Sequence, residues 1–136
     1  MIFDTGVLVA AANRRDRHHE SATKLIATPG LRVIPEPVVT ETCYMVASRL
    51  GSDVELAFVR SLLSRTFHVE QMTRQDRARA IELLQTYADA AIGYVDAAVV
   101  AIAERLGEHV IATLDRRDFS VVRPGHVDAF RIVPEG

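Results

Sequence analysis

Residues 93–107 read GYVDAAVVAIAERLG and predict a helix that is buried on nearly every side. Apolar residues recur at the three- and four-residue spacing of a helix face, and alanine and valine fill most of the rest. Gly107 stands where a glycine commonly ends a helix. One carboxylate, Asp96, therefore lies in the first turn of an otherwise apolar helix. A buried carboxylate needs a cation, a metal ion or a proton, although the helix dipole alone would favour an acid there.

Length and composition limit the classes of protein to consider. The 136 residues suffice for one domain with a sizeable core, and we expect a single domain over residues 1–136. The net charge of -2 gives no bulk basic signal for nucleic acid, and the single cysteine, Cys43, excludes an intrachain disulfide. Because the chain has neither a membrane-length apolar run nor a signal-peptide pattern, we expect a cytoplasmic protein without a membrane partner.

Short strands are expected to alternate with helices along the chain. Hydrophobic patterns predict strands at residues 1–3, 31–34, 67–70, 109–113 and 130–133. Helical patterns occupy residues 7–12, 18–27 and 38–50, and further helices begin near residues 52, 73 and 94. We expect residues 114–119 to form a loop. This alternation predicts an α/β sandwich with a mainly parallel sheet.

Four acidic residues occupy related positions in this predicted pattern. Asp4 and Asp115 follow apolar strands, whereas Glu41 and Asp96 lie near the starts of buried helices. Because ligands bind beyond the carboxyl ends of parallel strands, these acids could converge on one pocket. Two charges about 4 Å apart repel by about 4 kcal/mol at an effective dielectric of ~20, so such a cluster is hard to maintain without a divalent cation. An all-oxygen site favours Mg²⁺ or Mn²⁺, which can activate water for phosphodiester hydrolysis.

Four stretches, taken in order, resemble the PIN domain and, more narrowly, the VapC toxins of bacterial type II toxin–antitoxin pairs. They are IFDTGVLVA at residues 2–10, VTE at 39–41, VDA at 95–97 and ATLDRRDF at 112–119. The resemblance implies a PIN-like three-layer sandwich, with a mainly parallel central sheet of four to five short strands flanked by helices. It implies a Mg²⁺-dependent endoribonuclease, with Mn²⁺ able to substitute, that hydrolyses structured RNA such as tRNA or rRNA. It also implies a homodimer and a cognate VapB antitoxin that blocks the site.

The same resemblance assigns roles to individual residues. Asp4, Glu41, Asp96 and Asp115 match the family's acidic quartet, which would be both catalytic and metal-binding. Candidates for outer-shell or RNA contacts are Thr5, Thr113, Arg116, Arg117 and Asp118. Thr113 matches the family's polar residue before the last acid, and Asp118 is either an outer-sphere acid or a residue that only shapes its loop. The two arginines could hold RNA phosphates or pair with neighbouring aspartates.

Structural roles compete with these functional ones. Asp4 could cap the helix that follows it, Glu41 could be a solvated helix residue, and Asp115 could be a turn residue. We expect Asp89 to be a cap or loop acid, and His18 and His19 to have surface or capping roles. Tyr44 and Tyr94 are expected in the core rather than as stacking platforms for bases.

Other functional classes fit less well. Asp4-Thr5-Gly6 matches the aspartic-protease triplet, but that class needs a mostly β chain. A receiver domain also has an acidic Mg²⁺ pocket, but it needs a lysine after a late strand, and the only lysine here is Lys24. A catalytically silent RNA- or partner-binding PIN module would have a broken quartet, which is not seen.

Overall fold

Five short strands alternate with helices in residues 1–135, the part of the chain that the computed structural model describes. The strands are β1 (Ile2–Phe3), β2 (Val33–Pro35), β3 (His68–Glu70), β4 (Val110–Ala112) and β5 (Arg131–Val133). The helices are α1 (Thr5–Ala12), α2 (His19–Ala27), α3 (Glu36–Leu50), α4 (Ser52–Ser61), α5 (Arg74–Thr86), α6 (Tyr94–Leu106) and α7 (Arg116–Val121), with a 3-10 turn η1 (Ala88–Ala90) before α6.

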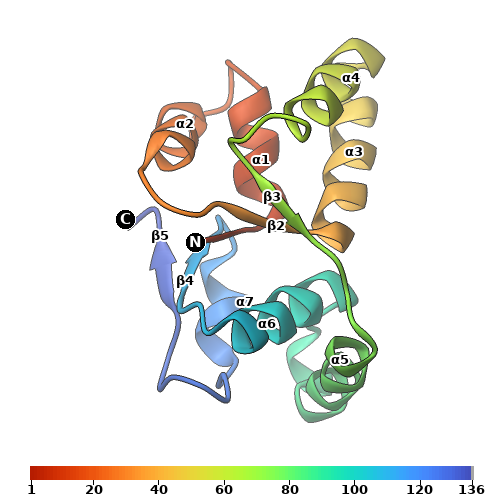
Figure 1. The fold of residues 1–136 in the computed structure, drawn as a ribbon, viewed down its shortest axis with the longest axis vertical. Helices are drawn as coiled ribbons and strands as arrows, with labels where there is room; N and C mark the ends of the chain where they lie inside the picture. The colour runs from red at the N-terminus through yellow and green to blue at the C-terminus, as the bar shows by residue number, and fades with distance from the viewer. Residues whose placement is uncertain (136) are drawn as a thin grey trace.

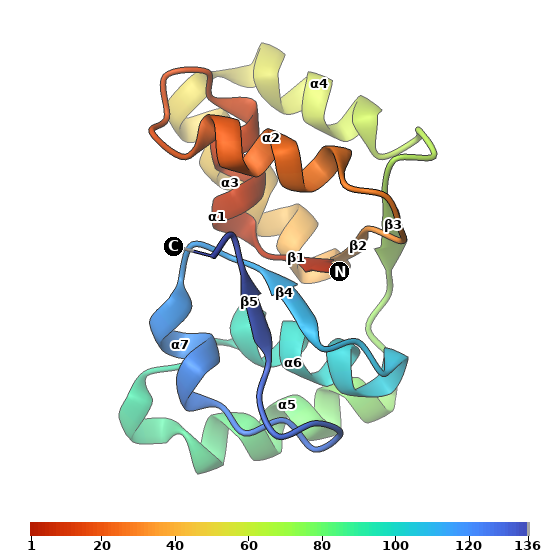
Figure 2. The same ribbon diagram turned by 90° about the vertical axis from the view of Figure 1, so that its left-hand side faces the viewer.

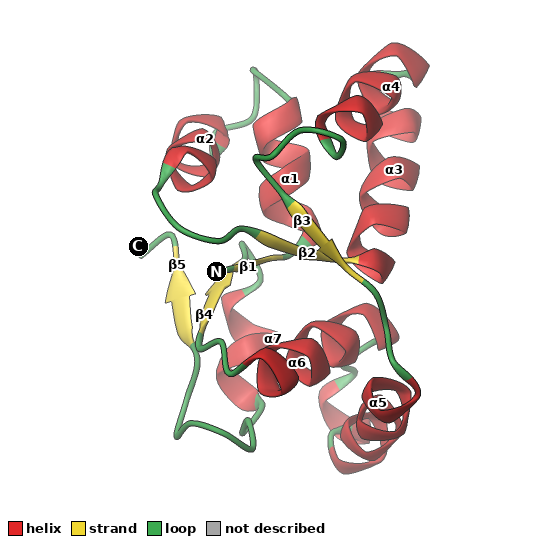
Figure 3. Cartoon of the chain, viewed as in Figure 1, coloured by secondary structure: helices red, strands yellow, loops and turns green. Residues whose placement is uncertain are grey.

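The strands form one parallel sheet between two helical layers (Figure 1). Helices α1 to α4 lie on one side of the sheet and α5 to α7 on the other, as the view turned by 90° also shows (Figure 2). The strands make a thin middle layer between these helices (Figure 3). This arrangement confirms the predicted three-layer α/β sandwich, and the sheet is wholly parallel among the described residues.

The strand order is β3-β2-β1-β4-β5, so the chain reverses its direction of travel across the sheet next to β1. It runs outward from β1 to β2 and β3, and then crosses back through α5 and α6 to β4, on the other side of β1. Ile2 pairs with Ile111 and Phe3 with Ala112, so β1 and β4 end at the same edge. A crevice at the carboxyl ends of such a strand pair is the usual ligand site of open parallel sheets.

Helix α6 is buried as the sequence pattern predicts, with every residue from 97 to 103 buried. It ends at Gly107, whose φ of 68° is left-handed. On its far side, α6 packs along α5, where Arg105 donates hydrogen bonds of 3.1 Å to both carboxylate oxygens of buried Asp76. This ion pair ties together the two helices that lead the chain from β3 to β4.

Two local predictions need correction. Residues 114–119 are not a loop throughout, because α7 begins at Arg116 and holds Phe119 in the core. A helix of six residues is too short for its apolar residues to repeat at helical spacing, so the sequence pattern does not reveal it. Helix α1 begins at Thr5, earlier than predicted, so that the helix follows Asp4 directly.

Within residues 1–135, no helix combines the length and the apolar character needed to cross a membrane.

Candidate metal centre

Asp4 and Thr113 meet at the ends of the two central strands. The backbone N–H of Asp4 donates to the carbonyl of Ala112 at 2.9 Å, which extends the β1–β4 pairing by one residue. This places the two side chains next to each other, and the Thr113 hydroxyl donates to Asp4 Oδ2 at 2.8 Å. The same hydroxyl accepts the backbone N–H of Asp115 at 2.9 Å. Thr113 therefore links two candidate acids through one buried oxygen.

Asp4 makes no side-chain capping bond to α1, so the alternative role as a helix cap is not observed. Its side chain is nearly inaccessible, with the residue only 7% exposed. Burial raises the pKa of Asp4, the hydrogen bond from Thr113 opposes that rise, and the charges of Glu41 and Asp115 add to it. A carboxylate so placed gains from a cation in the pocket.

Asp96 and Asp115 reach the same pocket from helix starts. Asp96 lies in the first turn of α6, where its Oδ2 accepts the backbone N–H of Gly93 at 3.4 Å. Burial and the nearby charge of Asp4 raise the pKa of Asp96 to about 7. Asp115 is the N-cap of α7 and accepts the backbone N–H of Asp118 at 3.3 Å. Burial and Asp115 also raise the pKa of Asp118.

A pocket of about 520 Å³ brings the acidic quartet together. Its lining residues are Asp4, Thr5, Gly6, Glu41, Met45, Asp96, Leu114 and Asp115. Glu41 comes from the second turn of α3, on the opposite side of the sheet from α6 and α7. The pocket therefore opens at the sheet edge, between the two helical layers.

No cationic side chain in the described part of the chain forms an ion pair with the acids of this pocket. Among residues 1–135, every ion pair within 4.0 Å involves acids outside the quartet. Arg116, next to Asp115 in the chain, donates instead to the carbonyl of Pro134 at 2.8 Å. The donor set is made of carboxylate oxygens with a neighbouring hydroxyl, which suits a hard divalent cation such as Mg²⁺. The residues present therefore fit a metal site.

The family model described as the PIN domain matches residues 1–123. The chain belongs to the PIN domain family. A curated relative, the ribonuclease VapC26 of Mycobacterium tuberculosis, is 34% identical over 135 residues, which cover 98% of this chain and 100% of the relative.

Solved structures of toxin and toxin–antitoxin proteins have a similar fold. The VapC20 toxin of M. tuberculosis, described as cleaving the sarcin–ricin loop, matches with a TM-score of 0.83 at 28% identity and covers 94% of this chain and 99% of its own. VapBC2 of Rickettsia felis, solved with a DNA fragment from its promoter, matches with a TM-score of 0.70 at 18% identity over 97% of this chain and 98% of its own. The second likeness, at its low identity, concerns the fold alone.

Among the secondary candidates of this PIN domain, Thr5 and Asp118 lie at the acids. Thr5 lines the quartet pocket, and its buried hydroxyl has no hydrogen-bond partner among the described residues. Asp118 is not part of that lining, but its carboxylate lies close to those of Asp96 and Asp115. Neither Arg116 nor Arg117 forms an ion pair with a neighbouring aspartate within the described part of the chain.

The remaining candidates lie elsewhere. Asp89 lies in η1, in the connection between α5 and α6. His18 is the N-cap residue of α2 without a side-chain capping bond, and His19 Nδ1 lies 2.9 Å from the carbonyl of Ala10. Both histidines therefore lie at the connection between α1 and α2, away from the lining of the acidic pocket.

The prediction that Tyr44 and Tyr94 belong to the core is wrong. Tyr44 is 74% exposed and Tyr94 43% exposed. Both line a second groove, of about 640 Å³, that shares Glu41 with the acidic pocket. A tyrosine within an apolar run indicates a helix but not which face of it is covered, because that depends on packing between helices.

Proposed function

We propose that this chain is a single PIN-like nuclease domain that acts as a metal-dependent endoribonuclease toxin. Its reaction is hydrolysis of phosphodiester bonds in structured RNA, with Mg²⁺ as the cofactor and Mn²⁺ able to replace it. Its substrate class, tRNA or rRNA, implies the cytoplasm as its compartment. The observation that carries the proposal is the pocket in which Asp4, Glu41, Asp96 and Asp115 meet, none of them in an ion pair with another residue of the range 1–135.

In this proposal, the four carboxylates would hold the divalent cation, which when bound supplies Lewis acidity and an activated water. The hydroxyl of Thr113 holds Asp4 in one orientation and fixes the backbone of Asp115 with its lone pair. The N-cap bond from Asp118 N–H sets the rotation of the Asp115 carboxylate. These contacts keep ligand oxygens in place before substrate arrives, which lowers the cost of ordering them.

The relatives support the choice of substrate and partner. One is named a ribonuclease, and another is described as cleaving the sarcin–ricin loop, an rRNA element. Solved matches include VapBC complexes, in which a VapC-type protein is found with its antitoxin. We therefore propose a cognate VapB-type antitoxin that covers the acidic pocket and silences the enzyme.

A homodimer is a further part of the proposal. The groove with the exposed Tyr44 and Tyr94 is also lined by the half-buried Pro37 and Met72. Exposed aromatic and apolar side chains in one groove are typical of a protein–protein contact. The groove adjoins Glu41, so a partner seated there would also border the catalytic pocket.

Cleavage of defined RNAs by metal-free purified protein tests this function. The substrates are a sarcin–ricin stem-loop and a tRNA transcript, each with added Mg²⁺, with Mn²⁺ and with chelator. We expect cleavage only with metal, and Asp4→Asn, Asp96→Asn or Asp115→Asn should each remove most of it, because each deletes a charged ligand and keeps the shape. Glu41→Gln should also be severe.

The matched control is Asp89→Asn, which changes the same residue type in η1, outside the pocket lining. It should cleave as the wild type does. RNA binding without cleavage under every metal condition would support the silent binding module instead. Near-normal cleavage by two of the three pocket variants would overturn the assignment of the metal ligands.

A further inference from the structure

A second polar pocket, of about 260 Å³, lies beside the acidic pocket at the carboxyl ends of β4 and β5. Figure 2 shows the start of α2 and the start of α7 on the same side of the molecule, above and below the end of β5. The pocket is lined by residues that follow the two strands and by the starts of these helices, among them His18, Ser21, Thr113, Leu114, Arg116 and Glu135. We call it the Arg116 pocket. Leu114 also lines the acidic pocket, so the two pockets share a wall.

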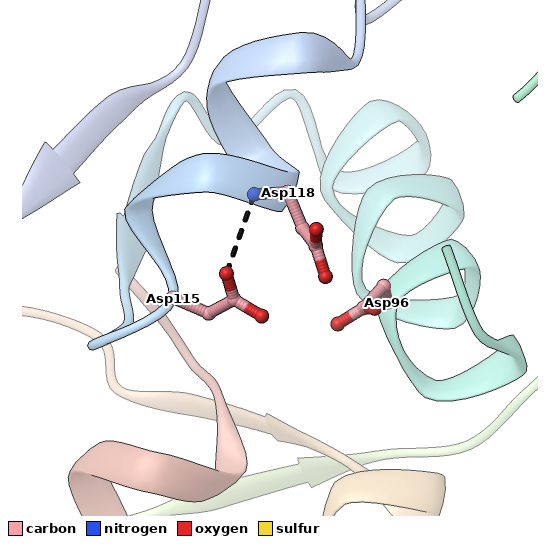
Figure 4. Close-up of side chains that lie close together, drawn as sticks. All are labelled: Asp96, Asp115 and Asp118. Carbon is pink, nitrogen blue, oxygen red and sulfur yellow. Dashed lines mark hydrogen bonds between the residues drawn. The ribbon is translucent and has the colours of Figure 1, made fainter. Parts of the chain in front are cut away.

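Two consecutive residues at the start of α7 divide opposite charges between these pockets. Asp115 lines the acidic pocket, and the close-up shows its carboxylate turned toward Asp96 and Asp118 (Figure 4). Arg116, the next residue, lines the Arg116 pocket instead. Because an α-helix has 3.6 residues per turn, successive side chains point about 100° apart. A carboxylate and a guanidinium that adjoin in sequence therefore face neighbouring pockets.

The guanidinium of Arg116 retains charge and donors for a ligand. Its Nη1 donates to the carbonyl of Pro134 at 2.8 Å, which holds the group at the end of β5. A guanidinium has five N–H donors, and Arg116 forms no ion pair within the range 1–135. Glu135 also lines the pocket, but its carboxylate is paired with Arg131 at 3.0 Å. An anion in the pocket would therefore meet a cation that no described acid neutralises.

The opposite wall of the pocket adds further donors. His18 is half-buried at the start of α2, and its Nε2 accepts a hydrogen bond from Arg17 Nε at 3.1 Å. In that arrangement Nδ1 carries the ring proton and can donate. Arg17 is held beside His18 and has no ion-pair partner in the described part of the chain. Phosphate oxygens suit such a group of donors, because arginine binds them through charge-assisted hydrogen bonds.

We propose that the Arg116 pocket binds a phosphate group of the RNA, next along the strand to the phosphate that is cleaved in the acidic pocket. The inference rests on the proposed function for RNA as the substrate. The carboxylates of the acidic pocket repel an RNA backbone, and a cationic site that shares a wall with them offsets this repulsion. Phosphate contacts also fix the register of a nucleic acid on its protein. Arg116 in this role binds phosphate and pairs with neither Asp115 nor Asp118.

The salt dependence of RNA binding tests this site without reference to cleavage. The parent protein carries Asp96→Asn, which should remove most cleavage, and anisotropy of a labelled sarcin–ricin stem-loop reports binding at constant Mg²⁺. We expect Arg116→Gln in this parent to lower the affinity by about tenfold, as for one hydrogen bond to a charged group. It should also reduce the slope of log affinity against log salt concentration by about 1, because one phosphate contact is lost.

Two further variants control for charge and position. Arg116→Lys keeps the charge and should keep the slope. The matched control is Arg60→Gln, since Arg60 is an exposed arginine in the last turn of α4 and lines neither pocket. It should bind RNA as the parent does, with the same slope.

Cleavage by the otherwise wild-type chain, measured alongside, separates this site from the proposed function. If that chain cleaves RNA but Arg116→Gln leaves the affinity and slope of the parent unchanged, the phosphate site is overturned and the nuclease stands. If it never cleaves, yet Arg116→Gln loses affinity and slope, the phosphate site stands and the nuclease fails. A parent that binds no RNA would overturn both.

Thermal melting separates phosphate binding from a purely structural role of Arg116 at the end of β5. A lower melting temperature of Arg116→Gln with the slope of the parent would show the structural role alone and overturn the site. If Arg116→Gln melts too low for binding to be measured, Ser21→Leu decides, because it narrows the pocket and leaves every arginine in place. Binding of RNA by Ser21→Leu as tight as that of the parent would then overturn the site.

Discussion

A single hydroxyl organises the centre of the site at the scale of residues. Thr113 Oγ1 donates to Asp4 and accepts from the backbone N–H of Asp115, so both of its hydrogen-bonding functions are used. Thr42 is equally buried, but its hydroxyl has no partner among the described residues. The two threonines therefore form a natural pair for measuring what the Thr113 contacts contribute to folding.

We predict that Thr113→Val lowers the free energy of unfolding by about 1–3 kcal/mol, because the buried carboxylate of Asp4 and the half-buried backbone N–H of Asp115 both lose their partner. Thr42→Val should be neutral or stabilising, since it removes an unsatisfied hydroxyl at nearly constant shape. Urea unfolding of both variants in chelator measures the difference. Equal losses in the two variants would mean that the Thr113 hydrogen bonds contribute no net stability.

The second prediction at this scale concerns Asp96, whose pKa is raised to about 7 by burial and by Asp4. An aspartate in the unfolded chain has a pKa of about 4. Between about pH 4 and pH 7, Asp96 is therefore protonated in the folded protein and ionised in the unfolded chain. The free energy of unfolding contributed by Asp96 therefore falls as pH rises through this window and is constant above it. The asparagine of Asp96→Asn does not ionise, so the variant does not lose this stability as pH rises. It should therefore melt higher than the wild type at pH 8 in chelator.

A difference of ~1 kcal/mol corresponds to a few degrees in a domain of this size. The difference between the two proteins should shrink toward pH 4, where Asp96 is protonated in the folded state. Added Mg²⁺ should stabilise the wild type by mass action and the variant less. A variant that melts lower than the wild type at pH 8 would instead indicate that Asp96 only complements the helix dipole.

At the scale of elements, the pairing of α5 with α6 sets the position of Asp96. Asp76 on α5 is 3% exposed, accepts the backbone N–H of Thr73 at 2.9 Å and receives Arg105 of α6 on both oxygens. Burial by itself would raise the pKa of Asp76, but the hydrogen bonds from Arg105 and Thr73 outweigh it and lower the pKa. The contact therefore stabilises the fold above about pH 4 and less as pH falls further.

We predict that Asp76→Asn lowers the free energy of unfolding by about 3 kcal/mol at pH 7, because Arg105 loses its buried partner. Glu20→Gln is the control, since Glu20 pairs with Lys24 on the exposed surface of α2, and it should change stability by less than ~0.5 kcal/mol. Chemical denaturation at pH 7 and pH 3 measures both. A penalty for Asp76→Asn that does not shrink at pH 3 would contradict the ionic origin.

At the scale of the whole molecule, the groove lined by Tyr44 and Tyr94 beside the acidic pocket is the surface that we propose for self-association. We predict a homodimer at micromolar concentration, which Tyr44→Arg should shift toward monomer because it places a charge in the apolar contact. Leu63→Arg is the control, since Leu63 is 91% exposed and lies outside the groove. Light scattering distinguishes the states, and a monomeric wild type would contradict the proposed dimer.

The sequence by itself determined the architecture, because strand and helix periods are local properties. The alternation of apolar strands with helices indicated a parallel sheet, and the apolar run around Asp96 indicated the buried helix α6. Acids that follow strands or begin helices could be picked out in the same way, since their positions in these elements need no knowledge of packing. The stretches that resemble the PIN domain were also visible as short runs of letters.

Only the tertiary structure decided how these elements face one another. The exposure of Tyr44 and Tyr94 depends on which helix faces are covered, and a continuous apolar run carries no mark of that. Helix α7 exists because Phe119 packs into the core, a contact between residues far apart in sequence. The approach of Asp118 to Asp96 follows from the placement of α7 beside α6. Such side-chain directions are fixed by long-range packing, which a pattern of neighbouring residues does not contain.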